Sequence, residues 1–144
     1  MRQTMKRLVL AASGALLGLI GGALLIAPKA FLATSDVYVD RDPGLMSELA
    51  APSGILILTG ALMLISAFKS RLFDLALILG AIVYGTYGVG RVISMALHGV
   101  PSDSLIAATV IELAIAGVLA GLGFSTRPDQ VASEANAQML QSSL

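Results

Sequence analysis

The sequence of 144 residues contains no cysteine, no tryptophan and a single histidine, His98. The absence of cysteine excludes disulfide bonds, thiolate metal sites and cysteine nucleophiles. A single histidine excludes a metal site made only of histidines from one chain. The sequence also has no glycine-rich phosphate loop, metal signature or nucleophile motif. We therefore expect no cofactor and no metal, and we assign no catalytic residue.

Charge is scarce as well. Lys, Arg, Asp and Glu make up 12% of the residues, whereas about a quarter are charged in an ordinary globular protein. The formal net charge is zero, which argues against a nucleic-acid partner because phosphate binding needs a concentrated basic surface. Hydrophobic residues make up 56%, and the mean hydropathy is +0.87. This composition leaves too little polar surface to coat a soluble domain, so we expect a lipid bilayer around most of the chain.

Four apolar runs are long enough to cross the hydrocarbon core of a bilayer as helices, which takes about 20 residues. They cover residues 8–27, 45–68, 72–97 and 104–124. Because the last two connections are short, we predict an all-α fold, a transmembrane four-helix up-down-up-down bundle within residues 1–126. Residues 127–144 form a polar cytoplasmic tail in this prediction. The first run also resembles a signal peptide, but it is longer than the typical hydrophobic region of one, which favours a retained helix.

Basic residues indicate the orientation of these spans. If the spans alternate in direction, one side carries Arg2, Lys6, Arg7, Lys69, Arg71 and Arg127, and the other carries Lys29 and Arg41. Lys and Arg accumulate in cytoplasmic loops. We therefore expect a multi-pass protein of the cell inner membrane with both termini in the cytoplasm. The segment 28–42 is then the only sizeable external one, and we expect a surface loop at 36–40, where a strand-like alternation has no strand to pair with.

Local signals indicate how the helices begin and pack. Asp42 followed by Pro43 is typical of a helix N-cap and first helical position. Glycines recur every fourth residue in the first span and again in the fourth, at Gly14, Gly18, Gly22, Gly117 and Gly121. Small residues allow close helix approach in a membrane. We expect these faces to seat neighbouring helices of the same chain, with a homo-oligomer or another membrane protein as the alternative partner.

Charged residues within the spans are few, and such residues are costly in lipid. Glu48, Arg91 and Glu112 all fall in the outer half of the predicted bilayer. Helical spacing gives shared faces to Tyr84, Tyr87, Arg91, Ser94 and His98 in the third span and to Glu48, Pro52, Ile55 and Thr59 in the second. Pointed inward, these faces predict an outward-facing polar pocket floored by Tyr84 and Thr59. The candidate ligand-binding residues are Glu48, Tyr84, Tyr87, Arg91, His98 and Glu112.

Three functions fit this pattern. The leading hypothesis is a binding or accessory protein in which Arg91 holds a lipid-like or small polar ligand. A second is a structural subunit of a membrane assembly, with Arg91 and Glu112 as an ion pair that fixes helix register. A third is a membrane-embedded enzyme acting on a lipophilic substrate, with Glu112 as acid or base. His98 at a helix end is better explained as an interfacial residue or a partner of the helix C-terminus than as a catalyst.

The segment from Glu48 to about Leu122 carries a recognisable set of motifs. After Glu48 come Pro52-Ser53-Gly54, then Gly88-Val89-Gly90-Arg91, His98-Gly99-Val100-Pro101-Ser102, and Glu112. In this pattern the chain resembles the bacterial four-span integral membrane family known as domain of unknown function 4345. An arginine commonly follows the first glutamate in that family, and here Leu49 and Ala50 stand there instead. The resemblance implies a four-span fold and a membrane location, and it implies no activity.

Overall fold

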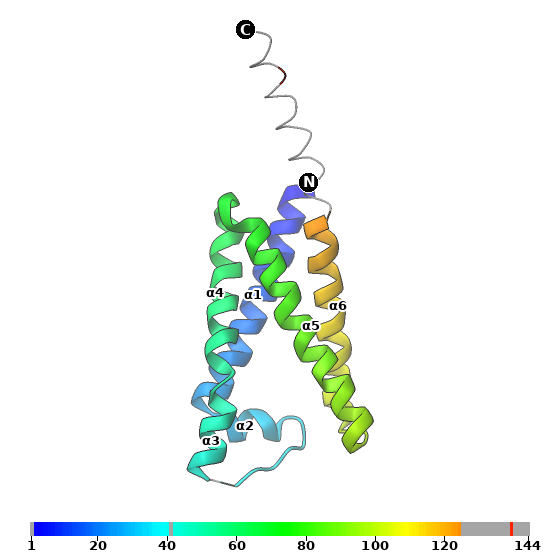
Figure 1. Ribbon diagram of the computed structural model, residues 1–144. Coiled ribbons are helices and arrows are strands. Elements are labelled where there is room, and N and C mark those ends of the chain that lie inside the picture. Colours follow the sequence, from blue (N-terminus) through cyan, green and yellow to red (C-terminus); the bar gives the residue numbers. More distant parts are fainter. Residues whose placement is uncertain (1, 41, 125–138, 140–144) are drawn as a thin grey trace.

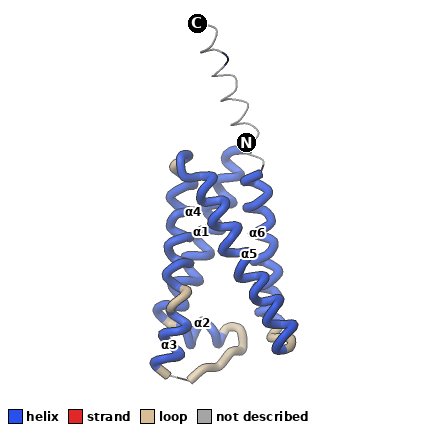
Figure 2. Tube along the Cα trace, viewed as in Figure 1, coloured by secondary structure: helices blue, strands red, loops and turns tan. Residues whose placement is uncertain are grey.

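The computed structural model describes residues 2–40, 42–124 and 139. Within these residues the chain is helical and contains no strand (Figure 2). The elements in order are α1 (Arg2–Ile26), α2 (Pro28–Ala33), α3 (Pro43–Ala50), α4 (Ser53–Phe68), the 3-10 turn η1 (Ser70–Leu72), α5 (Phe73–His98) and α6 (Asp103–Phe124), as drawn in Figure 1. The predicted polar tail at 127–144 lies outside the described residues, apart from residue 139.

Four segments of the described chain are long and apolar enough to cross a membrane. They are Gln3–Ile26, Pro43–Phe68, Ser70–His98 and Asp103–Phe124. Large hydrophobic side chains on their outer faces are exposed, among them Leu19, Leu58, Ile82 and Val118. Apolar surface of this extent is unfavourable in water and is covered in a bilayer. The protein is therefore an all-α, multi-pass membrane protein, which confirms the predicted fold class.

The second span is interrupted. Asp42 caps its first helix, α3, because the Asp42 side chain accepts a hydrogen bond of 2.8 Å from the backbone N–H of Leu45, and this confirms the predicted N-cap. Helix α3 ends at Ala50 and α4 begins at Ser53. Pro52 lies in the two-residue gap and has no N–H to donate to the preceding turn. The proline therefore explains the break near the start of this span.

The long helices pack as two pairs. Helix α1 lies mainly against α4, α5 lies mainly against α6, and a smaller contact between α4 and α5 joins the pairs. In Figure 1 the start of α1, the turn before α5 and the last turn of α6 lie at one end, which we call the Lys69 end. Helices α2 and α3 and the turn at 99–102 lie at the other, the Pro101 end. The pairs approach each other at the Lys69 end and diverge towards the Pro101 end (Figure 1).

Glycine allows the backbones of α1 and α4 to touch. A Cβ atom at Gly60 would lie 2.6 Å from the carbonyl oxygen of Gly14 and 2.7 Å from the nitrogen of Gly18. The prediction that the α1 glycines seat a neighbouring helix therefore holds for this contact. It does not hold for α6, where a Cβ atom at Gly117 or Gly121 would meet no described atom within 4 Å. This face of α6 points away from its partner α5.

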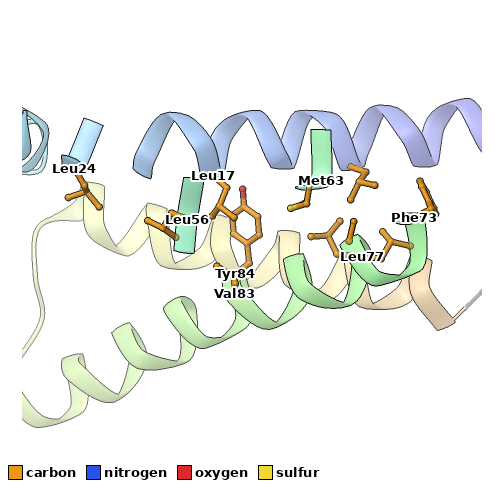
Figure 3. Packing of buried hydrophobic residues seen from close by; sticks show 11 residues of the cluster. Leu17, Leu24, Leu56, Met63, Phe73, Leu77, Val83 and Tyr84 are labelled. Carbon is orange, nitrogen blue, oxygen red and sulfur yellow. The ribbon is translucent and has the colours of Figure 1, made fainter. Parts of the chain in front are cut away.

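Buried apolar side chains fill the space between α1, α4 and α5 (Figure 3). The largest fully buried ones include Tyr84, Met63 and Leu77. The Tyr84 hydroxyl donates a buried hydrogen bond of 2.6 Å to the backbone oxygen of Ser13. This bond ties α5 directly to α1 and so links the two helix pairs across the core.

The segment between α1 and α3, which was predicted to be an external loop, differs in part from that prediction. It begins with the short helix α2, and residues 34–40 follow as turns and irregular chain. Pro28 stands at the first position of α2, where its missing N–H costs nothing. The strand-like stretch 36–40 forms no strand, as expected for a segment with no strand to pair with.

Candidate functional site

A cavity of about 250 Å³ lies between the helix pairs in the Pro101 half of the protein. We call it the Arg91 cavity. Its apolar lining comes from all the long helices and from α2, and it includes Leu17, Phe31, Leu56, Val83 and Ala108. Its polar lining comes from α5, α6 and the loop after α2, namely Tyr84, Tyr87, Arg91, Glu112 and Ser35. The cavity therefore has a largely hydrocarbon wall and one polar side.

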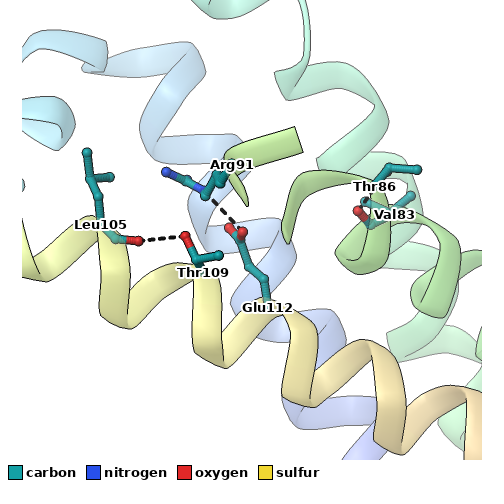
Figure 4. A network of polar contacts seen from close by, with 6 residues as sticks. All are labelled: Val83, Thr86, Arg91, Leu105, Thr109 and Glu112. Atoms are coloured by element: carbon teal, nitrogen blue, oxygen red, sulfur yellow. Dashed lines mark hydrogen bonds and ion pairs between the residues drawn. The ribbon is translucent and has the colours of Figure 1, made fainter. Parts of the chain in front are cut away.

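Arg91 and Glu112 form an ion pair on that polar side. The Arg91 Nε atom donates to a carboxylate oxygen of Glu112 at 3.0 Å (Figure 4). Helix packing brings them together: a Cβ atom at Gly88 would lie 2.7 Å from the Leu113 side chain, so α5 and α6 touch beside the pair. The Glu112 side chain is 11% exposed, whereas the Arg91 side chain is 34% exposed. The arginine is therefore the more accessible member.

The ion pair uses only part of its hydrogen-bonding capacity. A guanidinium has five N–H donors, and within the described residues Arg91 bonds only through Nε. In Figure 4 the far end of the guanidinium extends away from Glu112. The second carboxylate oxygen of Glu112 also has no partner among the described residues. Arg91 can therefore donate further hydrogen bonds, and Glu112 can accept one more.

The two tyrosines of α5 are used differently. Tyr84 is 1% exposed, and its hydroxyl is committed to the backbone of Ser13. Tyr87 is half-buried one turn closer to Arg91, and its hydroxyl has no hydrogen bond within the described part of the chain. Tyr84 therefore supports the cavity wall, and Tyr87 offers a polar group to it.

Helix α2 and the loop that follows it close the Pro101 end of the cavity. Phe31, Leu32, Ser35 and Val37 all line it. The Ser102 hydroxyl, at the start of α6, donates a hydrogen bond of 2.8 Å to the backbone oxygen of Ser35. The segment between α1 and α3 is thus fastened to the opposite helix pair, and it covers the space between the pairs.

The sequence matches the family described as Domain of unknown function (DUF4345) over residues 5–122. The chain belongs to this family. No curated protein and no solved structure matches it. The match confirms the resemblance found in the motifs between Glu48 and Glu112, and it brings no assigned activity to this DUF4345 chain.

Two of the six predicted site residues of the DUF4345 chain lie away from the cavity. Glu48 is exposed on α3 and does not line the cavity. His98 is exposed in the last turn of α5, where its Nδ1 atom lies 3.2 Å from the backbone oxygen of Ser94. Thr59, predicted at the floor, is buried in α4 but is not part of the lining. The structure brings Tyr84, Tyr87, Arg91 and Glu112 together, and the role of these four in binding a ligand stays a prediction.

The contributions of α1 and of the segment between α1 and α3 to the cavity of this DUF4345 chain were not predicted. Leu17, Ile20 and Leu24 line the cavity from α1, but the glycine pattern indicated only the face of α1 that packs against another helix, and the other faces of this span are uniformly apolar. Phe31 and Leu32 follow Pro28 by three and four residues. That spacing is typical of a short helix with one apolar face, and α2 could have been predicted from it.

Proposed function

We propose that this protein is a binding or accessory protein that holds a lipid-like or small polar ligand in the Arg91 cavity. The observation that carries the proposal is the guanidinium of Arg91, which is held by Glu112 through Nε while its two Nη atoms have no partner among the described residues. The Arg91 side chain is 34% exposed, so these donors are accessible, and a charged group within a membrane-spanning helix gains from polar partners. A ligand that accepts hydrogen bonds from the Nη atoms supplies such a partner, and the apolar wall beside it suits a hydrocarbon chain.

Native mass spectrometry of the protein, extracted in a mild detergent, tests this proposal. We expect a co-purifying mass in the wild type and its loss in Arg91→Ala. A matched pair of variants on α6 tests whether the ligand lies in the cavity, because Ala108 lines the cavity and the adjacent Ala107 is exposed. Ala108→Phe should lose the mass by filling the cavity, and Ala107→Phe should keep it. Equal retention by all three variants would refute a ligand in this cavity.

The rival interpretation is an ion pair that only fixes the register of α5 against α6. Removing one member of such a pair leaves an uncompensated charge, whereas replacing both by apolar residues is often tolerated. In that case Arg91→Ala prevents stable expression, and the double variant Arg91→Leu, Glu112→Leu restores it without any change in bound mass. The ligand proposal instead expects the double variant to fold and to carry no ligand.

A structural subunit of a membrane assembly is a second candidate. The exposed face of α6 around Gly117 and Gly121, which meets no described atom, favours it because small residues allow close helix approach. A partner or a second copy would bring another helix onto this face. Gly117→Leu should then reduce the mass of the extracted particle in light scattering, and the same substitution at Gly54, which also meets no atom, should not.

We also propose that the protein lies in a bacterial inner membrane with both termini in the cytoplasm. The basic residues Lys6, Arg7, Lys69 and Arg71 belong to segments at the Lys69 end, and the acidic residues Asp36, Asp40, Asp42 and Asp103 belong to the Pro101 end. Positive charge marks the cytoplasmic side. Green fluorescent protein fused after residue 70 should be fluorescent, and alkaline phosphatase fused after residue 100 should be active. The reverse pattern would contradict this orientation.

A further inference from the structure

The lining of the Arg91 cavity also indicates which ligands it accepts. We propose that the ligand is an uncharged, single-chain amphiphile whose head group offers a carbonyl or hydroxyl oxygen. This inference rests on the proposed function, since it assumes that the cavity holds a ligand. It goes further by excluding anionic lipids, which a free arginine alone would favour.

The charge balance of the cavity carries the argument. Of the described residues that line it, two are charged, Arg91 and Glu112, and they already form a pair. Their sum is zero. An anionic head group at the Nη atoms would therefore add an uncompensated negative charge close to Glu112. Such a charge is unfavourable in a mostly apolar environment, so the pair selects against an anion as well as against a cation.

Hydrogen bonding favours a neutral head group that can both accept and donate. The Nη atoms of Arg91 are donors only, and the second oxygen of Glu112 is an acceptor only. Neither has a partner among the described residues. A carbonyl or ether oxygen accepts from Arg91, a hydroxyl donates to Glu112, and the Tyr87 hydroxyl can serve either role. Hydrogen bonds to charged groups are stronger than those between neutral groups, so an uncharged ligand still gains specific contacts.

The size of the cavity favours a single chain. Its volume of about 250 Å³ corresponds to the liquid volume of about eight water molecules, and pockets for drug-sized ligands begin at about 300 Å³. The cavity therefore has room for a small head group and the first part of one chain. The head group of a phospholipid with two chains attached is too large.

The test compares two probes with chains of ten carbons, 1-monodecanoylglycerol and decyl sulfate. The first is neutral and offers an ester carbonyl and two hydroxyls, and the second is an anion at all accessible pH values. Each is titrated into the detergent-solubilised wild-type protein, and the bound fraction is read by native mass spectrometry. We expect the neutral probe to bind at least about tenfold more tightly, a difference of one decade in Kd.

Glu112→Gln tests the charge argument directly, because glutamine keeps the shape of the side chain and removes its negative charge. The cavity then carries the positive charge of Arg91 alone, and the preference should shift towards decyl sulfate by about tenfold or more. Glu48→Gln is the matched control. It removes the same charge from an exposed residue outside the cavity and should leave the wild-type preference unchanged.

Each outcome bears on one of the two proposals. If the wild type binds neither probe, the proposed function fails. If the wild type binds decyl sulfate as tightly as the neutral probe, this inference is overturned and the binding function stands. The comparison of the two probes on the wild-type protein tests the preference for a neutral ligand even if the Glu112→Gln variant does not fold. Retention of the neutral preference in a folded Glu112→Gln variant also overturns the charge argument.

Discussion

Replacing Gly14 by alanine should destabilise the protein relative to the same replacement at Gly18, one helical turn later. The two glycines are equivalent in the sequence pattern, but their surroundings differ. A Cβ atom at Gly14 would lie 2.7 Å from the Met63 Cβ and 2.8 Å from the Gly60 carbonyl oxygen, whereas a Cβ atom at Gly18 would meet no described atom within 4 Å. Only the first substitution therefore pushes α1 away from α4.

The magnitude follows from two opposing terms. Alanine is more favourable than glycine inside a helix by about 1 kcal/mol, and this gain applies equally at Gly14 and Gly18. Inserting a methyl group into a well-packed contact costs about 1–3 kcal/mol. That cost applies at Gly14 alone, because the atoms in its way belong to the backbone of α4 or are attached to it and cannot rotate aside. The difference in unfolding free energy between the two variants isolates this packing cost.

Reversible unfolding in mixed micelles, followed by circular dichroism at 222 nm, measures this difference. We expect Gly18→Ala to be as stable as the wild type or more stable, and Gly14→Ala to be about 1–3 kcal/mol less stable than Gly18→Ala. Gly117→Ala, on the open face of α6, is a second control and should behave like Gly18→Ala. Equal stability of the Gly14 and Gly18 variants would refute the close contact between α1 and α4.

Three further predictions use the same unfolding measurement. Tyr84→Phe removes the buried hydrogen bond to α1 and should lower the free energy of unfolding by about 0.5–1.5 kcal/mol. Tyr87→Phe removes a hydroxyl with no partner among the described residues and should change it little. Equal losses would contradict the different roles assigned to the two tyrosines. Ser53→Ala removes a fully buried hydroxyl that has no hydrogen-bond partner among the described residues, so it should stabilise the protein by about 1 kcal/mol, and a clear loss of stability would contradict this assignment. Asp42→Ala removes the N-cap of α3 and should cost about 1 kcal/mol, unlike Asp40→Ala in the preceding loop.

The fold was predictable because its signals are local. The length of an apolar run decides whether a helix can cross a bilayer, and the described part of the chain has four such segments. The cap at Asp42 and the break at Pro52 also depend only on neighbouring residues. The rotation of each helix about its axis is not local. The predicted inward face of α4 included Ile55, which is 56% exposed, while Leu56 and Met63 are buried.

The candidate site was predictable where a charged residue interrupts an apolar span. Arg91 and Glu112 stand out as charges in apolar spans, and they meet in the structure. Glu48 gave the same signal, but it is exposed on α3 and does not line the cavity. The apolar wall from α1 and α2 could not be assigned, because the glycines of α1 indicate the face towards α4 and its other membrane-spanning faces are uniformly apolar, while α2 lies in a segment that was predicted to be an external connection.

The position of the cavity follows from the lengths of the connections. Helices α4 and α5 are joined by the short turn at 69–72, and small residues keep them close there: a Cβ atom at Gly80 would lie 2.8 Å from the Met63 side chain. At the Pro101 end both connections, 27–42 and 99–102, join helices of the same pair, so no connection holds the two pairs together there. The pairs diverge towards this end, and α2 and the following loop occupy the space between them. Because α5 and α6 stay packed beside Arg91, the cover of the cavity at this end comes from α2 and the loop, and the hydrogen bond from Ser102 to Ser35 fastens that loop to the α5–α6 pair.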